Sequence, residues 1–187
     1  MFLKLFGAAF VIAGCSALGI GYGRKLNLHL EELRFLRELY RMIRGEIQYT
    51  KEPFPEVMLE VSSRIKEPYA SLFVQAHRAF EEQGSLQFPQ WFRSYTSGTL
   101  ESYRRERGMT DEEWEQFLSL GGQTGYLDLD MQIGTLKLSG ERWETWIREA
   151  ESRSDRRRRI GSCLGSAWRG VFDDPAAVRK KKGRKCV

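Results

Sequence analysis

The chain has 187 residues, 41% of them hydrophobic and 29% charged, with a formal net charge of +5. Six of the basic residues lie between Arg179 and Lys185, so the rest of the chain is nearly neutral. Three widely separated cysteines (Cys15, Cys163 and Cys186) argue against a disulfide framework and a CxxC metal site, and favour a reducing compartment.

The first predicted element is the uncharged stretch Leu5–Gly23. A helix of this length rises about 1.5 Å per residue and just reaches across a hydrocarbon core of roughly 30 Å. Its only polar groups are the hydroxyls of Ser16 and Tyr22. We therefore predict a transmembrane anchor over residues 1–24, which leaves about 160 residues for one modest domain.

The flanking charges predict the side of the membrane on which that domain lies. Lys4 precedes the uncharged stretch, whereas six basic residues follow it closely: Arg24, Lys25, Arg34, Arg37, Arg41 and Arg44. Because lysine and arginine concentrate on the cytoplasmic side of a span, the domain is predicted to be cytoplasmic.

A lipoprotein signal is the alternative interpretation of the same stretch. Ile12-Ala13-Gly14-Cys15 has the small residues that precede an acylated cysteine, and the domain would then be exported. The chain stays apolar beyond Ser16, however, where a lipoprotein usually begins a polar tether. We favour the anchor.

The following elements all have helical periodicity. Leu26–Tyr49 carries one apolar stripe, and this helix can continue the anchor as one rod. It must end before Glu52, because Pro53 and Pro55 disfavour helical geometry in the residues before them. Similar stripes cover 54–65 and 69–80. An aromatic segment covers 88–95. Regular structure is expected to break at 96–99, and a new helical turn is expected from Leu100.

Two further helices are predicted from their capping residues. Thr110 and Glu113 form a capping box, and the helix after it should bury Trp114, Phe117, Leu118 and Gly121. Asp128 is the expected N-cap of the last long helix. That helix has a heptad-like seam: Leu129, Ile133, Leu136, Gly140, Trp143, Ile147 and Ala150.

No stretch shows the alternation of a β-strand, so the predicted fold is all-α: the anchor and a bundle of about six antiparallel helices. Residues 25–159 form the helical domain. Residues 160–187, a short apolar segment and a basic tail, are expected to be disordered or to lie at the membrane interface.

The sequence predicts no catalytic centre, metal site or cofactor-binding site. His29 and His77 are the only histidines and have no second ligand nearby in sequence, so we expect ordinary surface or core-edge residues. The acidic residues fall at predicted helix starts and solvent faces. We therefore predict a protein that is not an enzyme.

The basic runs favour a membrane surface as their ligand. Arg156, Arg157, Arg158 and Arg159 extend the last helix, and Arg24 and Lys25 follow the anchor. Basic residues near a membrane gain about 1 kcal/mol each from anionic lipid. No aromatic residues interleave with these runs or with the tail, so nucleic acid is the weaker alternative.

The order of several short motifs resembles the stage III sporulation protein AB family of endospore-forming bacteria, over residues 1–165. The matching features are the glycine-rich span, Glu46-Ile47-Gln48-Tyr49, Pro53 and Pro55, Leu120-Gly121, Gly125, Asp128 and Gln132, the helix over 136–150, the arginine-rich sequence after it, and Leu164-Gly165.

The resemblance implies a membrane component of the channel between mother cell and engulfed forespore, located in the mother-cell membrane around the forespore. It also implies a domain similar to the type II secretion F (platform) proteins, acting as a scaffold beside the stage III sporulation AA ATPase and other channel proteins. Self-association is left open.

By match to the family pattern, the candidate site residues are Glu46, Tyr49, Gly125, Asp128 and Gln132. We favour structural roles over partner contact: Gly125 and Asp128 terminate and cap helices, and the other three link helices by buried hydrogen bonds.

The chain departs from the family at its C-terminal end, because members usually close with a second apolar span. Here 160–172 is only thirteen residues long and includes Arg169. It is too short to cross a bilayer as a helix.

Overall fold

A computed structural model of the chain describes residues 2–124 and 129–172, and every regular element within these ranges is helical. The prediction of an all-α fold with about six helices is therefore confirmed. The elements are α1 (Phe2–Thr50), α2 (Phe54–Ser62), α3 (Tyr69–Gln83), α4 (Phe88–Arg107), α5 (Asp111–Leu118), the 3-10 helix η1 (Ser119–Thr124) and α6 (Leu129–Phe172).

The chain divides into two compact units, Met1–Arg148 and Glu149–Val187. The first unit contains α1 to α5, η1 and the beginning of α6. Within the described ranges the second unit is the remainder of α6, which is helical through the predicted apolar segment as far as Phe172. Arg156 to Arg159 continue this helix, as expected, and the basic tail at 179–185 lies outside the described residues.

Helix α1 joins the predicted anchor to the domain without a break, as the sequence allowed. The C-terminal part of its apolar stripe is buried: Leu33, Leu36, Leu39, Tyr40, Ile43 and Ile47. The helix ends at Thr50, before the two prolines, and the Lys51 amide donates to the Ile47 carbonyl at 3.0 Å.

In the part of the chain that the structure describes, no helix is both long and apolar enough to qualify as a membrane span. Residues 5–23 have a helical backbone within α1, but most of their side chains lie outside the described residues. The anchor over residues 1–24 therefore stays a prediction.

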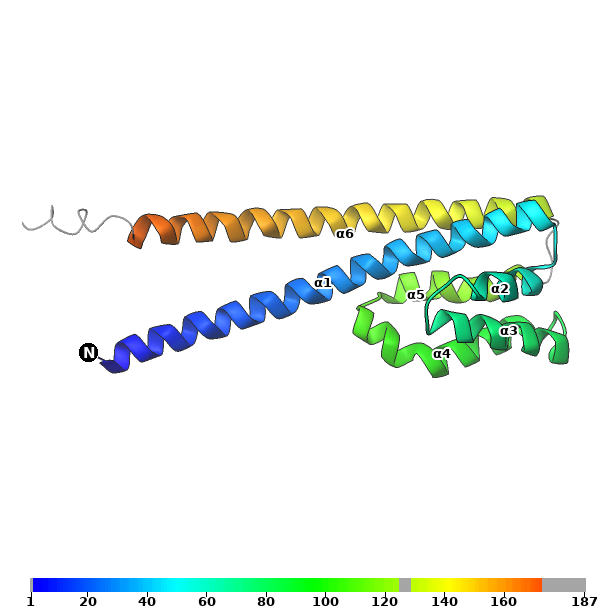
Figure 1. The fold of residues 1–187 in the computed structure, drawn as a ribbon, viewed down its shortest axis with the longest axis horizontal. Helices are drawn as coiled ribbons and strands as arrows, with labels where there is room; N and C mark the ends of the chain where they lie inside the picture. Colours follow the sequence, from blue (N-terminus) through cyan, green and yellow to red (C-terminus); the bar gives the residue numbers. More distant parts are fainter. Residues whose placement is uncertain (1, 125–128, 173–187) are drawn as a thin grey trace, which may run out of the picture. The chain divides into compact units, whose positions relative to one another are not determined.

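Helices α2 to α5 gather along the C-terminal half of α1, and the N-terminal half runs beyond them (Figure 1). Helix α2 is shorter than its apolar stripe suggested and ends at Ser62, where the hydroxyls of Ser62 and Ser63 donate to the carbonyls of Leu59 and Glu60. These bonds satisfy carbonyls at the helix end and help the chain to turn.

Helix α4 corrects the sequence prediction, because it is one continuous helix where a break at 96–99 was expected. Phe88, Phe92, Thr96 and Leu100 recur every four residues, and all four are buried. Exposed Gly98 costs about 1 kcal/mol in a helix, and the packing of this stripe outweighs that cost.

The capping box of α5 forms as predicted. The Glu113 amide donates to Thr110 Oγ1 at 3.3 Å, and the Thr110 amide donates to Glu113 Oε2 at 2.7 Å. Trp114, Phe117 and Leu118 are buried, as is Gly121 in η1, which packs on α4.

Helix α6 buries four of its seven predicted seam residues: Leu136, Trp143, Ile147 and Ala150. Leu129, Ile133 and Gly140 are half-buried. The ring of Trp143 packs against Tyr40 of α1, with centroids 5.7 Å apart. The seam prediction thus identified the face by which α6 joins the bundle.

Candidate functional site

Glu32 of α1 is fully buried, contrary to the expectation that the acidic residues lie at helix starts and solvent faces. Tyr69 of α3 donates its hydroxyl to Glu32 Oε1 at 2.7 Å, and Tyr103 of α4 donates to Oε2 at 3.0 Å. Lys66 Nζ and Arg107 Nε lie 3.4 and 3.6 Å from Oε2. One carboxylate thus joins three helices.

The tyrosines around Glu32 act as hydrogen-bond donors. Burial raises the pKa of Tyr69, and the negative charge of Glu32 raises it further. The pKa of Tyr103 is raised by the same two causes in the same order. Both phenols therefore keep their protons across the physiological range, and the cluster is a fixed polar junction.

A second buried carboxylate connects α5 to α1. The Nε2–H group of His29 donates to both carboxylate oxygens of Glu113, at 3.0 and 2.9 Å, and both residues are buried. Glu113 is also the acidic member of the capping box. His29 is therefore a core-edge residue, as expected, but it has a specific structural partner.

The environment of Glu113 favours its charged form. Burial by itself would raise the pKa of this carboxyl group, but the hydrogen bonds from His29 and the Thr110 amide outweigh burial, and the pKa lies below its ordinary value. A lowered pKa in the folded state contributes stability above the unfolded pKa of about 4.3, and this contribution is lost as pH falls through the folded-state value.

Glu113→Gln should therefore lower the free energy of unfolding by about 1–3 kcal/mol at neutral pH, and the difference from wild type should shrink below about pH 4. Urea denaturation of the full-length chain at several pH values, followed by tryptophan fluorescence, measures this. Glu112→Gln, in the same helical turn but exposed, is the matched control. A pH-independent difference would contradict this account of Glu113.

Gln116 of α5 links three helices near the surface. Its backbone carbonyl accepts the Tyr40 hydroxyl at 2.9 Å. Its side-chain amide donates to Ser139 Oγ at 3.0 Å, and its side-chain oxygen accepts from Arg142 at 2.7 Å. These bonds hold α6 against α1 and α5 at Ser139 and Arg142.

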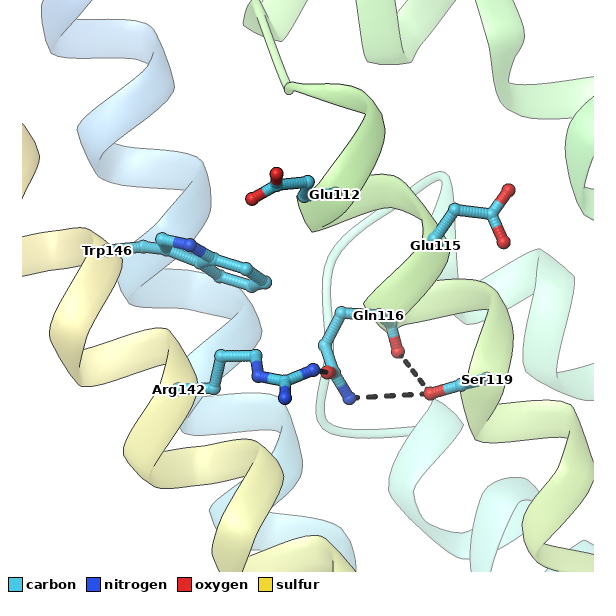
Figure 2. Close-up of a pocket in the computed structure, with 6 residues that line it drawn as sticks. All are labelled: Glu112, Glu115, Gln116, Ser119, Arg142 and Trp146. Atoms are coloured by element: carbon cyan, nitrogen blue, oxygen red, sulfur yellow. Dashed lines mark hydrogen bonds between the residues drawn. The ribbon is translucent and has the colours of Figure 1, made fainter.

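A pocket of about 670 Å³ opens between α5, η1 and α6, and it is our candidate functional site. Its lining residues are Glu112, Glu115, Gln116, Ser119, Arg142 and Trp146. In Figure 2 the indole of Trp146 extends from α6 toward α5, between the carboxylate of Glu112 and the guanidinium group of Arg142. We call this pocket the α5–α6 groove.

The charged side chains that line the α5–α6 groove differ in whether they have an ion-pair partner. Glu115 forms an ion pair with Arg93 of α4, whereas the guanidinium group of Arg142 donates to the neutral side chain of Gln116 and has no ion-pair partner among the described residues. Glu112 is exposed and has no ion-pair partner among the described residues. The groove therefore has a carboxylate and a guanidinium group, each without an ion-pair partner in the described ranges, on either side of an aromatic ring, and a charged group of a ligand can be recognised on the Glu112 side.

The candidate residues from the sequence lie apart from this groove's lining. Glu46 is half-buried, and its Oε2 accepts from Arg64 at 3.1 Å, which connects α1 to the segment after α2 at the surface. Tyr49 is 87% exposed, so the expected buried hydrogen bond is wrong for this residue. Gln132 is half-buried on α6.

The remaining candidates are outside or at the edge of what the structure describes. Gly125 and Asp128 lie outside the described residues, as do the side chains of 156–159. Arg24 and Lys25 are exposed on α1. Their contact with a membrane surface stays a prediction.

Sequence reasoning missed Glu32, the His29–Glu113 pair and the α5–α6 groove. One signal for Glu32 was present: it precedes Leu33 and lies four residues before Leu36, in the stripe that faces the core. Its partners come from segments 34–75 residues away, and no local pattern pairs them.

Comparisons with known proteins place the chain in one family. Residues 4–168 match the family described as stage III sporulation protein AB. Searches of curated proteins and of solved structures found no match, so the expected likeness to secretion platform proteins stays a prediction. Since the family match covers most of the chain, from the start of α1 almost to the end of α6, the protein is a member of the stage III sporulation protein AB family.

Proposed function

We propose that this sporulation protein is a non-enzymatic scaffold, anchored by residues 1–24 in the mother-cell membrane around the forespore, with its helical domain in the cytoplasm. It would act in the mother cell–forespore channel beside the AA ATPase. The observation that carries this proposal is the continuity of α1 from the apolar stretch into the bundle core. A membrane-embedded N-terminal half would hold the bundle directly at the bilayer surface.

The family membership supports the sporulation role, and the polar junctions support a scaffold. Glu32 and Glu113 are each engaged by buried partners that fix helix positions. Such groups stabilise one arrangement of the helices, which a platform for other proteins requires. The basic residues Arg24 and Lys25, immediately after the anchor, would meet anionic lipid head groups.

Membrane fractionation tests the anchor. We expect full-length protein to resist a carbonate wash and a chain lacking residues 1–23 to be released by it. Retention of the shortened chain would contradict the single-anchor proposal and assign insertion to the C-terminal segment. Mass spectrometry of the purified full-length chain distinguishes an intact N-terminus from an acylated Cys15, which would instead support the lipoprotein alternative.

Copurification tests the partner. Full-length protein in detergent should retain the AA ATPase of the same bacterium on an affinity column, and a column carrying an unrelated single-span protein should not. Equal retention on both columns would contradict the ATPase partnership and leave the anchor unaffected.

A further inference from the structure

Helix α6 exposes a row of side chains that leads to the α5–α6 groove. Met131 is 58% exposed and Leu138 is 67% exposed. Arg142 is exposed, and Trp146 is half-buried in the groove. Steps of seven, four and four residues put these four side chains on one side of the helix, over about 22 Å. We call them the α6 row.

The α6 row is more than scattered surface hydrophobics, because it ends at a hollow lined by an aromatic ring. Isolated exposed leucines need no explanation, whereas apolar groups in line beside a concave site mark interaction surfaces. The other side of α6 already packs in the bundle through Leu136 and Trp143. The α6 row is thus the side of α6 that remains accessible to another molecule.

The carboxylate of Glu112 favours a positively charged group on that molecule. Glu112 supplies a carboxylate without an ion-pair partner in the described chain, next to the indole of Trp146. A guanidinium or ammonium group placed there gains a charge-assisted hydrogen bond and a cation–π contact. Arg142 is held by Gln116 at 2.7 Å on the other side of the indole (Figure 2).

We propose that the α5–α6 groove binds an arginine or lysine side chain on a helix of a partner protein, whose apolar residues cover Met131 and Leu138. The inference rests on the proposed function in supposing that the protein docks an assembly partner. A groove of about 670 Å³ has room for one long basic side chain and its flanking atoms. Arginine fits best, because its planar group both stacks on indole and pairs with a carboxylate.

A helical peptide tests the proposal without the natural partner. The probe is an acetylated and amidated, fluorescently labelled peptide on an alanine–glutamine background, with leucines at positions i and i+7 and arginine at i+15, which matches the spacing of Met131, Leu138 and Trp146. Its control carries citrulline, the neutral isostere of arginine. Fluorescence anisotropy with the full-length chain in detergent measures both affinities.

We expect the arginine peptide to bind roughly tenfold tighter than the citrulline peptide. Glu112→Gln should abolish this ratio, and Trp146→Leu should reduce it. Glu82→Gln, exposed on α3 and absent from the groove lining, should leave it unchanged. Equal binding of the two peptides to wild type, or a ratio that survives Glu112→Gln, would overturn the proposal.

Sedimentation tests the rival occupant, a second copy of this chain. Self-association that Glu112→Gln weakens, together with a lack of peptide binding, would overturn the proposal in favour of that copy. The ATPase column distinguishes the two levels of inference. If the arginine peptide binds selectively but the ATPase is not retained on the column, only the proposed ATPase partnership is contradicted. If the ATPase is retained equally well in the presence of either peptide and by the Glu112→Gln variant, only the groove proposal is contradicted.

Discussion

Glu32→Ala should lower the free energy of unfolding by about 3–5 kcal/mol, the largest loss that we expect from a single substitution in the bundle. The carboxylate is fully buried and accepts hydrogen bonds from Tyr69 and Tyr103. Its removal leaves those hydroxyls unpaired and leaves Arg107 beside the cavity without its counter-charge. The midpoint of urea denaturation of the full-length chain, followed by tryptophan fluorescence, measures the loss.

Two matched variants separate the charge of Glu32 from helix propensity. Glu31→Ala changes an exposed neighbour in the same helix and should alter stability by less than about 0.5 kcal/mol. Glu32→Gln keeps the shape and one acceptor but removes the charge, so its cost should fall between the two. Equal stabilities of Glu31→Ala and Glu32→Ala would show that the buried junction contributes nothing.

Gly121→Ala is expected to destabilise the protein by about 2–3 kcal/mol through overpacking. A β-carbon at this position would lie 2.7 Å from Cδ1 and 2.8 Å from Cβ and Cγ of Phe92. Phe92 is fully buried, with ring centroids 5.9 Å from Phe88 and 6.2 Å from Phe117. Relief of the clash therefore requires η1 and α4 to separate.

The adjacent glycine provides the control. A β-carbon at Gly122 meets nothing within 4 Å, so Gly122→Ala should be neutral or slightly stabilising. Thermal denaturation of the two variants and the wild type makes the comparison directly. If the Gly121 and Gly122 variants melt together, the close approach of η1 to Phe92 is not a feature of the protein in solution.

Local patterns in the sequence predicted most helix boundaries. Prolines 53 and 55 end α1, and the Thr110–Glu113 capping box begins α5. Each of these signals acts through its own backbone or through residues a few positions away. The apolar stripe of α1 and the seam of α6 were predictable for the same reason, since the helical period is a local property.

The failures occurred where distant segments compete with a local preference. The Thr96–Thr99 stretch has the composition of a loop, yet it is helical because Thr96 and Leu100 fill space in the core. Tyr49 has the character of a core aromatic but is exposed at the end of α1. In the first case burial outweighs the low helix propensity. In the second, Tyr49 lies on the solvent side of α1, opposite the buried Ile47 two residues before it.

The sequence by itself determined an all-helical chain, its family, and the uncharged N-terminal stretch Leu5–Gly23. Only the tertiary structure decided that Glu32 and Glu113 are buried and that Glu112, next to one of them, faces a groove. A carboxylate is stable in a core only when donors from other segments surround it. That condition depends on how helices meet in space, which the period of a single helix does not contain.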